Sequence, residues 1–167
     1  MPSAFRVEVS KDYLVFASAH FITFRGHQCE SLHGHNYRVG VAVEGSVDDE
    51  CLFVLDFSVL KRIVRRLVDE IDHKVLLPTL NPKLSYHEED GMLRVDYFGK
   101  PTYVFPRGDC ALLPIRNSTA EMLAEYLGTA VREQLARDGY RHLTRLELEV
   151  EENFGQSATY RAALAPD

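Results

Sequence analysis

The sequence predicts an α+β fold in which an antiparallel sheet carries helices on one face. Apolar and polar residues alternate over 5–20 and 33–45, and strand patterns return over 146–151 and 157–164 near the end of the chain. Apolar residues at helical spacing fill 57–71 between them. Because strands and helices fall in separate runs, the pattern favours an α+β arrangement.

The composition is typical of a globular chain. Its 167 residues suggest one domain over 1–167. The net charge of −6 argues against general binding to nucleic acids or membranes, but it allows a small anionic substrate held by local arginines and lysines. No signal peptide or membrane-spanning run is evident. Three widely spaced cysteines fit a reducing cytosol, so we expect a cytoplasmic protein.

Capping signals mark the two helices. Asp56 is a good N-cap residue for the helix over 57–71. Ser118 and Glu121 have the spacing of a capping box that opens a second helix. Gly139 is suited to the position just after the end of that helix.

Turn signals divide two further regions. The segment 5–20 reads as one strand or as two strands joined at 10–12. The stretch from about 86 to 116 is the least regular, and Asp90-Gly91 is a hairpin turn signal within it. Residues 102–105 have a strand-like composition. We therefore expect a β-hairpin inserted between the two helices.

Two histidines separated by one glycine, His33 and His35, open the strand over 33–45. Side chains at i and i+2 of a strand point to the same face, so both rings can reach one point, and His20 follows the preceding strand. Gly34 leaves room for close approach of the backbone. Three histidines with an open fourth position are typical of a catalytic zinc site. Three surface or hydrogen-bonded histidines are the alternative.

An ordered set of motifs spans nearly the whole chain and resembles the family of 6-pyruvoyl-tetrahydropterin synthases and 6-carboxy-tetrahydropterin synthases. The matching segments are Phe16-Ala17-Ser18-Ala19-His20, Cys29 before His33-Gly34-His35-Asn36-Tyr37, Leu55-Asp56-Phe57, Asp72-His73-Lys74, Ser118-Thr119-Ala120-Glu121, and Glu152 before Tyr160. The resemblance implies a tunnelling fold (T-fold), an antiparallel four-stranded sheet with two helices on one face. It also implies a homo-oligomer, usually a hexamer built as a dimer of trimers, with active sites between subunits.

The resemblance also implies roles for residues near the histidines. It makes His20, His33 and His35 the ligands of Zn2+. It makes Cys29 the catalytic thiol, whose reactive thiolate form a nearby cation favours. A fourth zinc ligand or an inert loop cysteine is the alternative for Cys29.

Asp72 and His73 match the family's proton-relay pair, in which a carboxylate orients an imidazole that titrates near neutral pH. Adjacent side chains do not face each other in regular structure. We therefore expect this pair in a loop, or Asp72 acting on another group. A polar helix end is the alternative reading.

Glu152 matches the glutamate that anchors the pterin, because an ionised carboxylate accepts hydrogen bonds through two oxygens. The neighbouring Glu151 leaves the register open. Thr119 and Glu121 match a pterin-pocket motif, and the capping box accounts for this segment equally well. The candidates for binding the triphosphate are Arg25, Lys74 and Arg161.

The implied activity is that of a zinc-dependent lyase acting on 7,8-dihydroneopterin triphosphate. The product is 6-carboxy-tetrahydropterin, which feeds 7-deazaguanine and queuosine synthesis, or 6-pyruvoyl-tetrahydropterin. Some family members instead use a glutamate three residues before the first histidine of His-Gly-His and make 6-hydroxymethyl-dihydropterin for folate synthesis. Glu30 occupies that position, so aldolase-type cleavage is an alternative. An alternative of another class is a non-catalytic zinc-binding assembly protein.

Overall fold

The structure, a computed structural model, describes residues 4–9, 12 and 14–164. Within these residues, the strands of the main sheet are β1 (Phe5–Val9), β2 (Val15–His20), β3 (His33–Gly45), β4 (Lys74–Pro78), β8 (Cys110–Leu113), β9 (Leu143–Asn153) and β10 (Gln156–Ala163). A separate three-stranded sheet contains β5 (Leu84–Glu89), β6 (Met92–Tyr97) and β7 (Lys100–Pro106). The helices are α1 (Phe57–Asp69) and α2 (Ala120–Arg137), and a short 3-10 turn, η2 (Arg107–Asp109), precedes β8.

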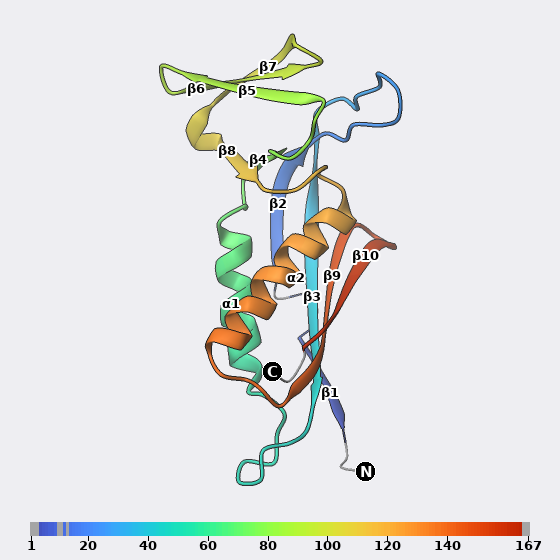
Figure 1. Cartoon of the computed structure of the whole chain (residues 1–167), viewed down its shortest axis with the longest axis vertical. Helices are drawn as coiled ribbons and strands as arrows, with labels where there is room; N and C mark the ends of the chain where they lie inside the picture. Colours follow the sequence, from blue (N-terminus) through green and yellow to red (C-terminus); the bar gives the residue numbers. More distant parts are fainter. Residues whose placement is uncertain (1–3, 10–11, 13, 165–167) are drawn as a thin grey trace.

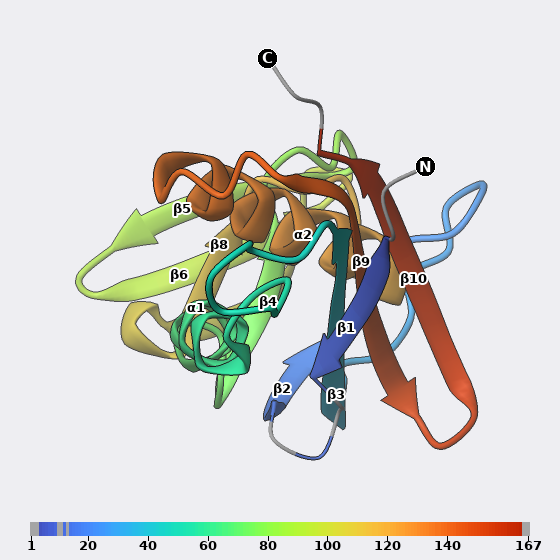
Figure 2. The same cartoon turned by 90° about the horizontal axis from the view of Figure 1, so that it is seen from below.

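The main sheet is built around the long strand β3. Its strand order is β10-β9-β3-β2-β4-β8, and β1 also pairs with β3. β2 and β1 pair with successive halves of β3, and β9 pairs with its other edge. Both helices cover one face of this sheet, and the three-stranded sheet lies at the end opposite β1 (Figures 1 and 2). The expected α+β fold is confirmed, with β2, β3, β9 and β10 pairing antiparallel.

The helices form where the sequence supplies caps and an apolar stripe. The side chain of Asp56 accepts a hydrogen bond from the Ser58 N–H at 2.8 Å, as expected of an N-cap. Gly139 has a φ of +83° just beyond the end of α2, a backbone conformation that favours glycine. The buried stripe of α1 packs into the main core and consists of Leu60, Ile63, Val64, Leu67 and Val68.

The middle of the chain differs from the prediction. The insert contains the expected hairpin, in which Asp90-Gly91 joins β5 to β6, and it adds a third strand, because Phe98-Gly99 joins β6 to β7. The prediction also has no strand at Lys74–Pro78. This strand, β4, pairs parallel with β2, and β8 pairs parallel with β4, so the main sheet is mixed.

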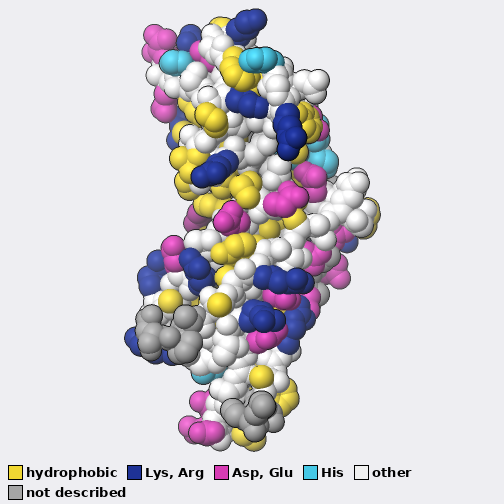
Figure 3. Space-filling model, turned by 45° about the vertical axis from the view of Figure 1, so that its right-hand side comes forward, with side chains coloured by type: hydrophobic (Ala, Val, Ile, Leu, Met, Phe, Trp, Pro, Cys, Tyr) yellow, Lys and Arg dark blue, Asp and Glu magenta, His cyan; other side chains and the backbone are white. Residues whose placement is uncertain are grey.

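A second hydrophobic core lies between the three-stranded sheet and the main sheet. Its buried residues are Phe21, Leu77, Leu93, Val95 and Cys110. On the face drawn in Figure 3, acidic and basic side chains intermingle over the surface. Among the described residues, no helix combines the length and apolar character needed to cross a membrane.

Candidate metal centre and active site

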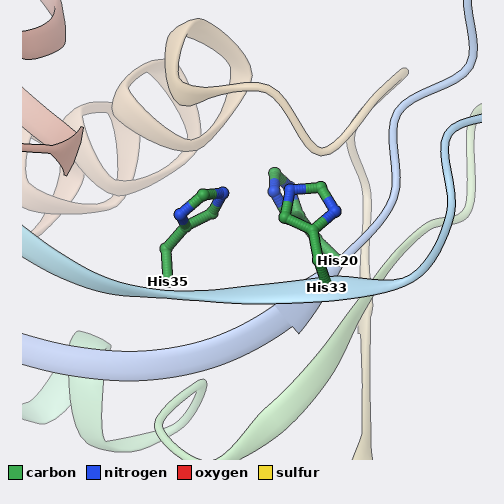
Figure 4. A group of neighbouring side chains, drawn as sticks. All are labelled: His20, His33 and His35. Atoms are coloured by element: carbon green, nitrogen blue, oxygen red, sulfur yellow. The ribbon is translucent and has the colours of Figure 1, made fainter.

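Strand register brings the three histidines together. His20, the last residue of β2, pairs with His33, the first residue of β3, and His35 lies two residues further along the same face. A Cβ atom at Gly34 would lie 3.2 Å from the carbonyl oxygen of Ser18, so glycine permits this close pairing. The potential ligand atoms of the three rings lie within 4.8 Å of one another. The rings gather on one side of the β3 ribbon (Figure 4).

Backbone carbonyls fix the protonation of two of these rings. Nδ1 of His20 lies 2.7 Å from the carbonyl oxygen of Ser118, and Nδ1 of His33 lies 2.9 Å from that of Ser31. A carbonyl oxygen only accepts hydrogen bonds, so each Nδ1 carries a proton, and in the neutral ring each Nε2 then keeps its lone pair. A hydrogen bond from the second ring nitrogen commonly orients metal-binding histidines in this way.

The Nε2 atom of His20 shows that the site fits a metal ion. It is buried and has no hydrogen-bond partner, and it lies 3.2 Å from Oε1 of Glu152, a second buried atom without one. Both atoms are acceptors, so they need a cation or a donor between them. Burial lowers the pKa of His20, which favours the neutral ring that a metal requires. Three imidazole nitrogens are a typical set of ligands for zinc.

The structure resolves the register of the two glutamates on β9. Glu151 pairs with Arg38, so the next residue, Glu152, turns to the opposite face. There its Oε1 also lies 3.7 Å from Nε2 of His35. Glu152 therefore belongs to the histidine cluster, and Glu151 does not share its face.

Sequence reasoning missed Tyr37 as part of this cluster. Its ring is fully buried, stacks on Phe16 at 4.7 Å and meets His20 and His35 edge-on, at 5.9 and 5.6 Å between centroids. Its hydroxyl is buried without a hydrogen-bond partner. Burial and the carboxylate of Glu152 raise its pKa, so this hydroxyl is a neutral donor. The alternation of β3, which places residue 37 on the face of residues 33 and 35, is the signal that identifies it.

Cys29 and Glu30 lie in the loop between β2 and β3. Burial and the nearby carboxylate of Glu30 raise the pKa of the Cys29 thiol, so the thiol is protonated near neutral pH. The carboxylate of Glu30 accepts a hydrogen bond from the Ile22 N–H at 3.2 Å and lies 3.8 Å from Nδ1 of His33. Glu30 thus contacts the histidine cluster directly.

Asp72 and His73 lie in the turn after α1, as expected. His73 has a φ of +56°, and its Nδ1 lies 2.9 Å from Oδ2 of Asp72. Oδ1 of Asp72 accepts a hydrogen bond from the Ala17 N–H at 2.8 Å. This bond lowers the pKa of Asp72. Asp72 therefore orients the imidazole and also anchors the turn to β2.

Within the described residues, His73 makes no hydrogen bond or ion pair with the histidine cluster. Its side chain is 82% exposed beside a groove. That groove includes Ala17, Ala19 and Asn36, which alternate with the residues facing the helices, and it also reaches His35. Among the described residues, no hydrogen bond or ion pair joins His73 to Cys29. In the part of one chain that the structure describes, the thiol and the relay pair therefore share no hydrogen bond or ion pair.

The start of α2 corrects the predicted capping box. Thr119 is the N-cap, and its side chain accepts a hydrogen bond from the Met122 N–H at 3.4 Å. Ser118 instead donates its hydroxyl to the carbonyl of Phe21 at 2.7 Å while its own carbonyl holds His20. Glu121 is exposed in the first turn. No hydrogen bond or ion pair within the described residues joins Thr119 or Glu121 to the histidines.

The three phosphate candidates lie apart from one another. Arg161 pairs with Glu147 at 2.9 Å. The ammonium of Lys74 donates to the carbonyl of Gly108, and Lys74 lines the same groove as His73. Arg25 is exposed in the loop before Cys29. The structure brings together none of these three cations.

Comparison with known proteins points to one family. The sequence profile described as 6-pyruvoyl tetrahydropterin synthase matches residues 8–163. The chain is 38% identical over 151 residues to a Methanocaldococcus jannaschii protein provisionally named a 6-carboxy-5,6,7,8-tetrahydropterin synthase, covering 90% of this chain and 91% of that protein. It is 26% identical to the 6-carboxy-5,6,7,8-tetrahydropterin synthase of Rickettsia typhi, covering 80% of this chain and 86% of that one.

Similar solved structures point to the same family. The 6-pyruvoyl tetrahydropterin synthase of Plasmodium falciparum superposes with a TM-score of 0.89 at 32% identity, covering 96% of this chain and 99% of that one. A Plasmodium vivax synthase, in which a glutamate described as a catalytic residue is replaced by cysteine, gives a TM-score of 0.89 at 30% identity with the same coverage.

Proposed function

The chain belongs to the 6-pyruvoyl tetrahydropterin synthase family and has its tunnelling fold, and we propose that it is a zinc-dependent lyase acting on 7,8-dihydroneopterin triphosphate. The main support for this proposal is Nε2 of His20, which is buried without a hydrogen-bond partner and lies close to Oε1 of Glu152. That arrangement suits a metal ion held by His20, His33 and His35 next to a carboxylate that can bind a pterin.

We infer 6-carboxy-tetrahydropterin as the main product, for 7-deazaguanine and queuosine synthesis. The similarity to proteins named for that product supports it. A second candidate activity, cleavage to 6-hydroxymethyl-dihydropterin, rests on Glu30, which lies 3.8 Å from His33. A solved Plasmodium vivax synthase has a glutamate described as a catalytic residue, which supports a catalytic role for a glutamate in this family.

Each residue has a task that follows from its surroundings. When Zn2+ is bound, it supplies Lewis-acid stabilisation of negative charge developing on substrate oxygens. Glu152 accepts hydrogen bonds from the pterin's amino and ring N–H groups, because an ionised carboxylate is an acceptor. Cys29 is protonated when free, so it needs a base to take its proton before it can accept one from the substrate.

His73 is suited to be that base. Its Nδ1 proton is held by Asp72, which leaves Nε2 free to accept a proton from the thiol. Because His73 and Cys29 share no hydrogen bond or ion pair within one chain, we propose that Asp72 and His73 come from a neighbouring copy in a homo-oligomer, a dimer of trimers. A fully active monomer by light scattering and assay would contradict this.

Product analysis of variants tests the proposed reaction. Zinc-loaded protein is incubated with 7,8-dihydroneopterin triphosphate and the products are identified by mass spectrometry. We expect Cys29→Ala to lose 6-carboxy-tetrahydropterin by at least about a hundredfold, since general acid–base catalysis contributes that much. We expect Glu30→Gln to lose only 6-hydroxymethyl-dihydropterin.

Two controls match these variants. Cys51→Ala removes an exposed free cysteine and Glu50→Gln an exposed loop carboxylate, and both should leave every product unchanged. If the zinc-loaded parent forms no product, the chain is the non-catalytic zinc-binding protein instead. If Glu30→Gln leaves the product ratio of the parent intact, the second activity does not depend on Glu30.

A further inference from the structure

The loop that carries Cys29 and Glu30 rests on the three-stranded insert. We propose that the insert holds this loop, residues 21–32, in its working geometry, and that Lys83 and Tyr103 are positioning residues for the reaction. The inference rests on the proposed function for its link to catalysis. The contacts themselves are independent of it.

Lys83, just before β5, closes the tip of the loop. Its ammonium donates hydrogen bonds to the carbonyl of Phe24 and, at 3.3 Å, to the carbonyl of Gly26. These carbonyls lie on either side of Arg25. The tip also has a backbone hydrogen bond of its own, from the Phe24 N–H to the Gln28 carbonyl at 2.9 Å. Charge-assisted hydrogen bonds are stronger than neutral ones, so the Lys83 cation adds a strong contact from the insert to this tip.

Tyr103, on β7, holds both ends of the loop. Its hydroxyl accepts a hydrogen bond from the Leu32 N–H at 3.3 Å, at the last residue before β3. Its ring lies against Phe21, the first residue after β2, with 5.2 Å between ring centroids. One side chain of the insert therefore contacts the two points where the loop leaves and rejoins the main sheet.

Packing extends the contact to the thiol. Cys29 and Leu32 pack against the second hydrophobic core, whose Leu93 and Val95 come from β6. At the outer end, His27 of the loop meets Phe98 of the β6–β7 turn, with 4.4 Å between ring centroids. The loop is thus supported along its length, and Figure 1 shows it emerging beside β5.

The insert also contributes a positive charge near the thiol. Burial and Glu30, on the loop itself, raise the pKa of Cys29, whereas Lys83 lowers it. Tyr97 of β6 has a buried hydroxyl without a hydrogen-bond partner, and burial and then the charge of a Cys29 thiolate raise the pKa of this hydroxyl. Removal of the Lys83 charge therefore has two consequences: a looser loop tip and a thiol that ionises at higher pH.

Limited proteolysis of the folded, full-length chain tests the contact without substrate. Trypsin cuts after Arg25 only when the tip opens, and the rate follows the open population when reclosing is fast. We expect Lys83→Met to accelerate this cut about tenfold, since hydrogen bonds from a charged group are lost. Lys83→Arg should restore most of the protection. Lys100→Met, which removes an exposed charge from the same insert, should match the parent.

Thiol titration and kinetics complete the test. In a Cys51→Ala background, alkylation of Cys29 should show a midpoint at higher pH in Lys83→Met than in the parent. Lys83→Met should turn over with a lower kcat and a nearly unchanged KM. Tyr103→Phe should also lower kcat without changing KM, but by a smaller factor.

Three outcomes would decide the matter. Parent-like cleavage at Arg25 together with a parent-like alkylation midpoint in Lys83→Met would overturn the positioning role. If Lys83→Met changes both the cleavage rate and the alkylation midpoint but keeps a parent-like kcat, the link between the insert and catalysis is overturned. Accelerated cleavage combined with an inactive parent would support the contact and count against the proposed function.

Discussion

At the scale of single residues, the histidine cluster follows from local pattern, but its supports do not. The period of a strand suffices to place His33 and His35 on one face. The carbonyl that orients His20 belongs to Ser118, which is 98 residues away in the sequence. The sequence suggests a helix cap at Ser118, a role that Thr119 performs in the structure. Only the folded topology brings residue 118 to residue 20.

The ionisation of Asp72 predicts how the stability of the fold depends on pH. The hydrogen bond that Asp72 accepts from the Ala17 N–H lowers the pKa of Asp72 in the folded chain. The ionised carboxylate therefore stabilises the fold at pH values above the unfolded pKa. This stabilisation is lost as the pH falls through the folded pKa. We expect Asp72→Asn to be less stable at pH 7 by up to about 1 kcal/mol after solvent screening. The difference from the parent should shrink below about pH 4.

Urea unfolding of metal-free protein between pH 7 and pH 3 measures this difference. Asp69→Asn, which changes an exposed carboxylate at the end of α1, is the control and should stay close to the parent throughout. A gap between Asp72→Asn and the parent that widens on acidification would contradict the assignment.

At the scale of elements, the strongly periodic segments were predictable, whereas β5, the first strand of the insert, and β4 were not. Helix α1 has a cap and a continuous apolar stripe, so its sequence alone identifies it. β5 is largely exposed, with residues such as Ser85, His87 and Glu88 that do not signal a strand, and its pairing with β6 decides its structure. β4 is short and apolar, and such a segment cannot be assigned from periodicity alone.

The contact of α2 with the sheet gives a prediction for packing. A Cβ atom at Gly128 would lie 2.5 Å from Cδ1 of Tyr160 on β10 and 3.5 Å from Cβ of Leu148 on β9. Alanine favours helices over glycine by about 1 kcal/mol, but overpacking costs about 1–3 kcal/mol. We expect Gly128→Ala to lower the free energy of unfolding.

Urea unfolding at neutral pH measures this change. Thr129→Ala, at the next position of the same helix, is the control and should change stability little. A Gly128→Ala protein more stable than the parent would show that helix propensity outweighs the contact with Tyr160.

At the scale of the whole molecule, the main sheet supplies the histidine cluster and the insert supports the loop beside it. The tunnelling fold was predictable because ordered motifs span the chain, and the similarity to solved synthases confirms it. The separation of Cys29 from His73 was not predictable from those motifs. This separation depends on the face of the sheet on which each residue lies. It is the reason to expect an active site shared between copies of the chain.

The most direct test of the central claim couples metal content to turnover. Protein stripped with a chelator is titrated with Zn2+, and bound zinc and product from 7,8-dihydroneopterin triphosphate are measured in the same samples. We predict that turnover rises with zinc and saturates at one ion per chain, and that His33→Ala binds zinc at least about tenfold more weakly. Full turnover by the metal-free chain, or undiminished zinc binding by His33→Ala, would contradict the account.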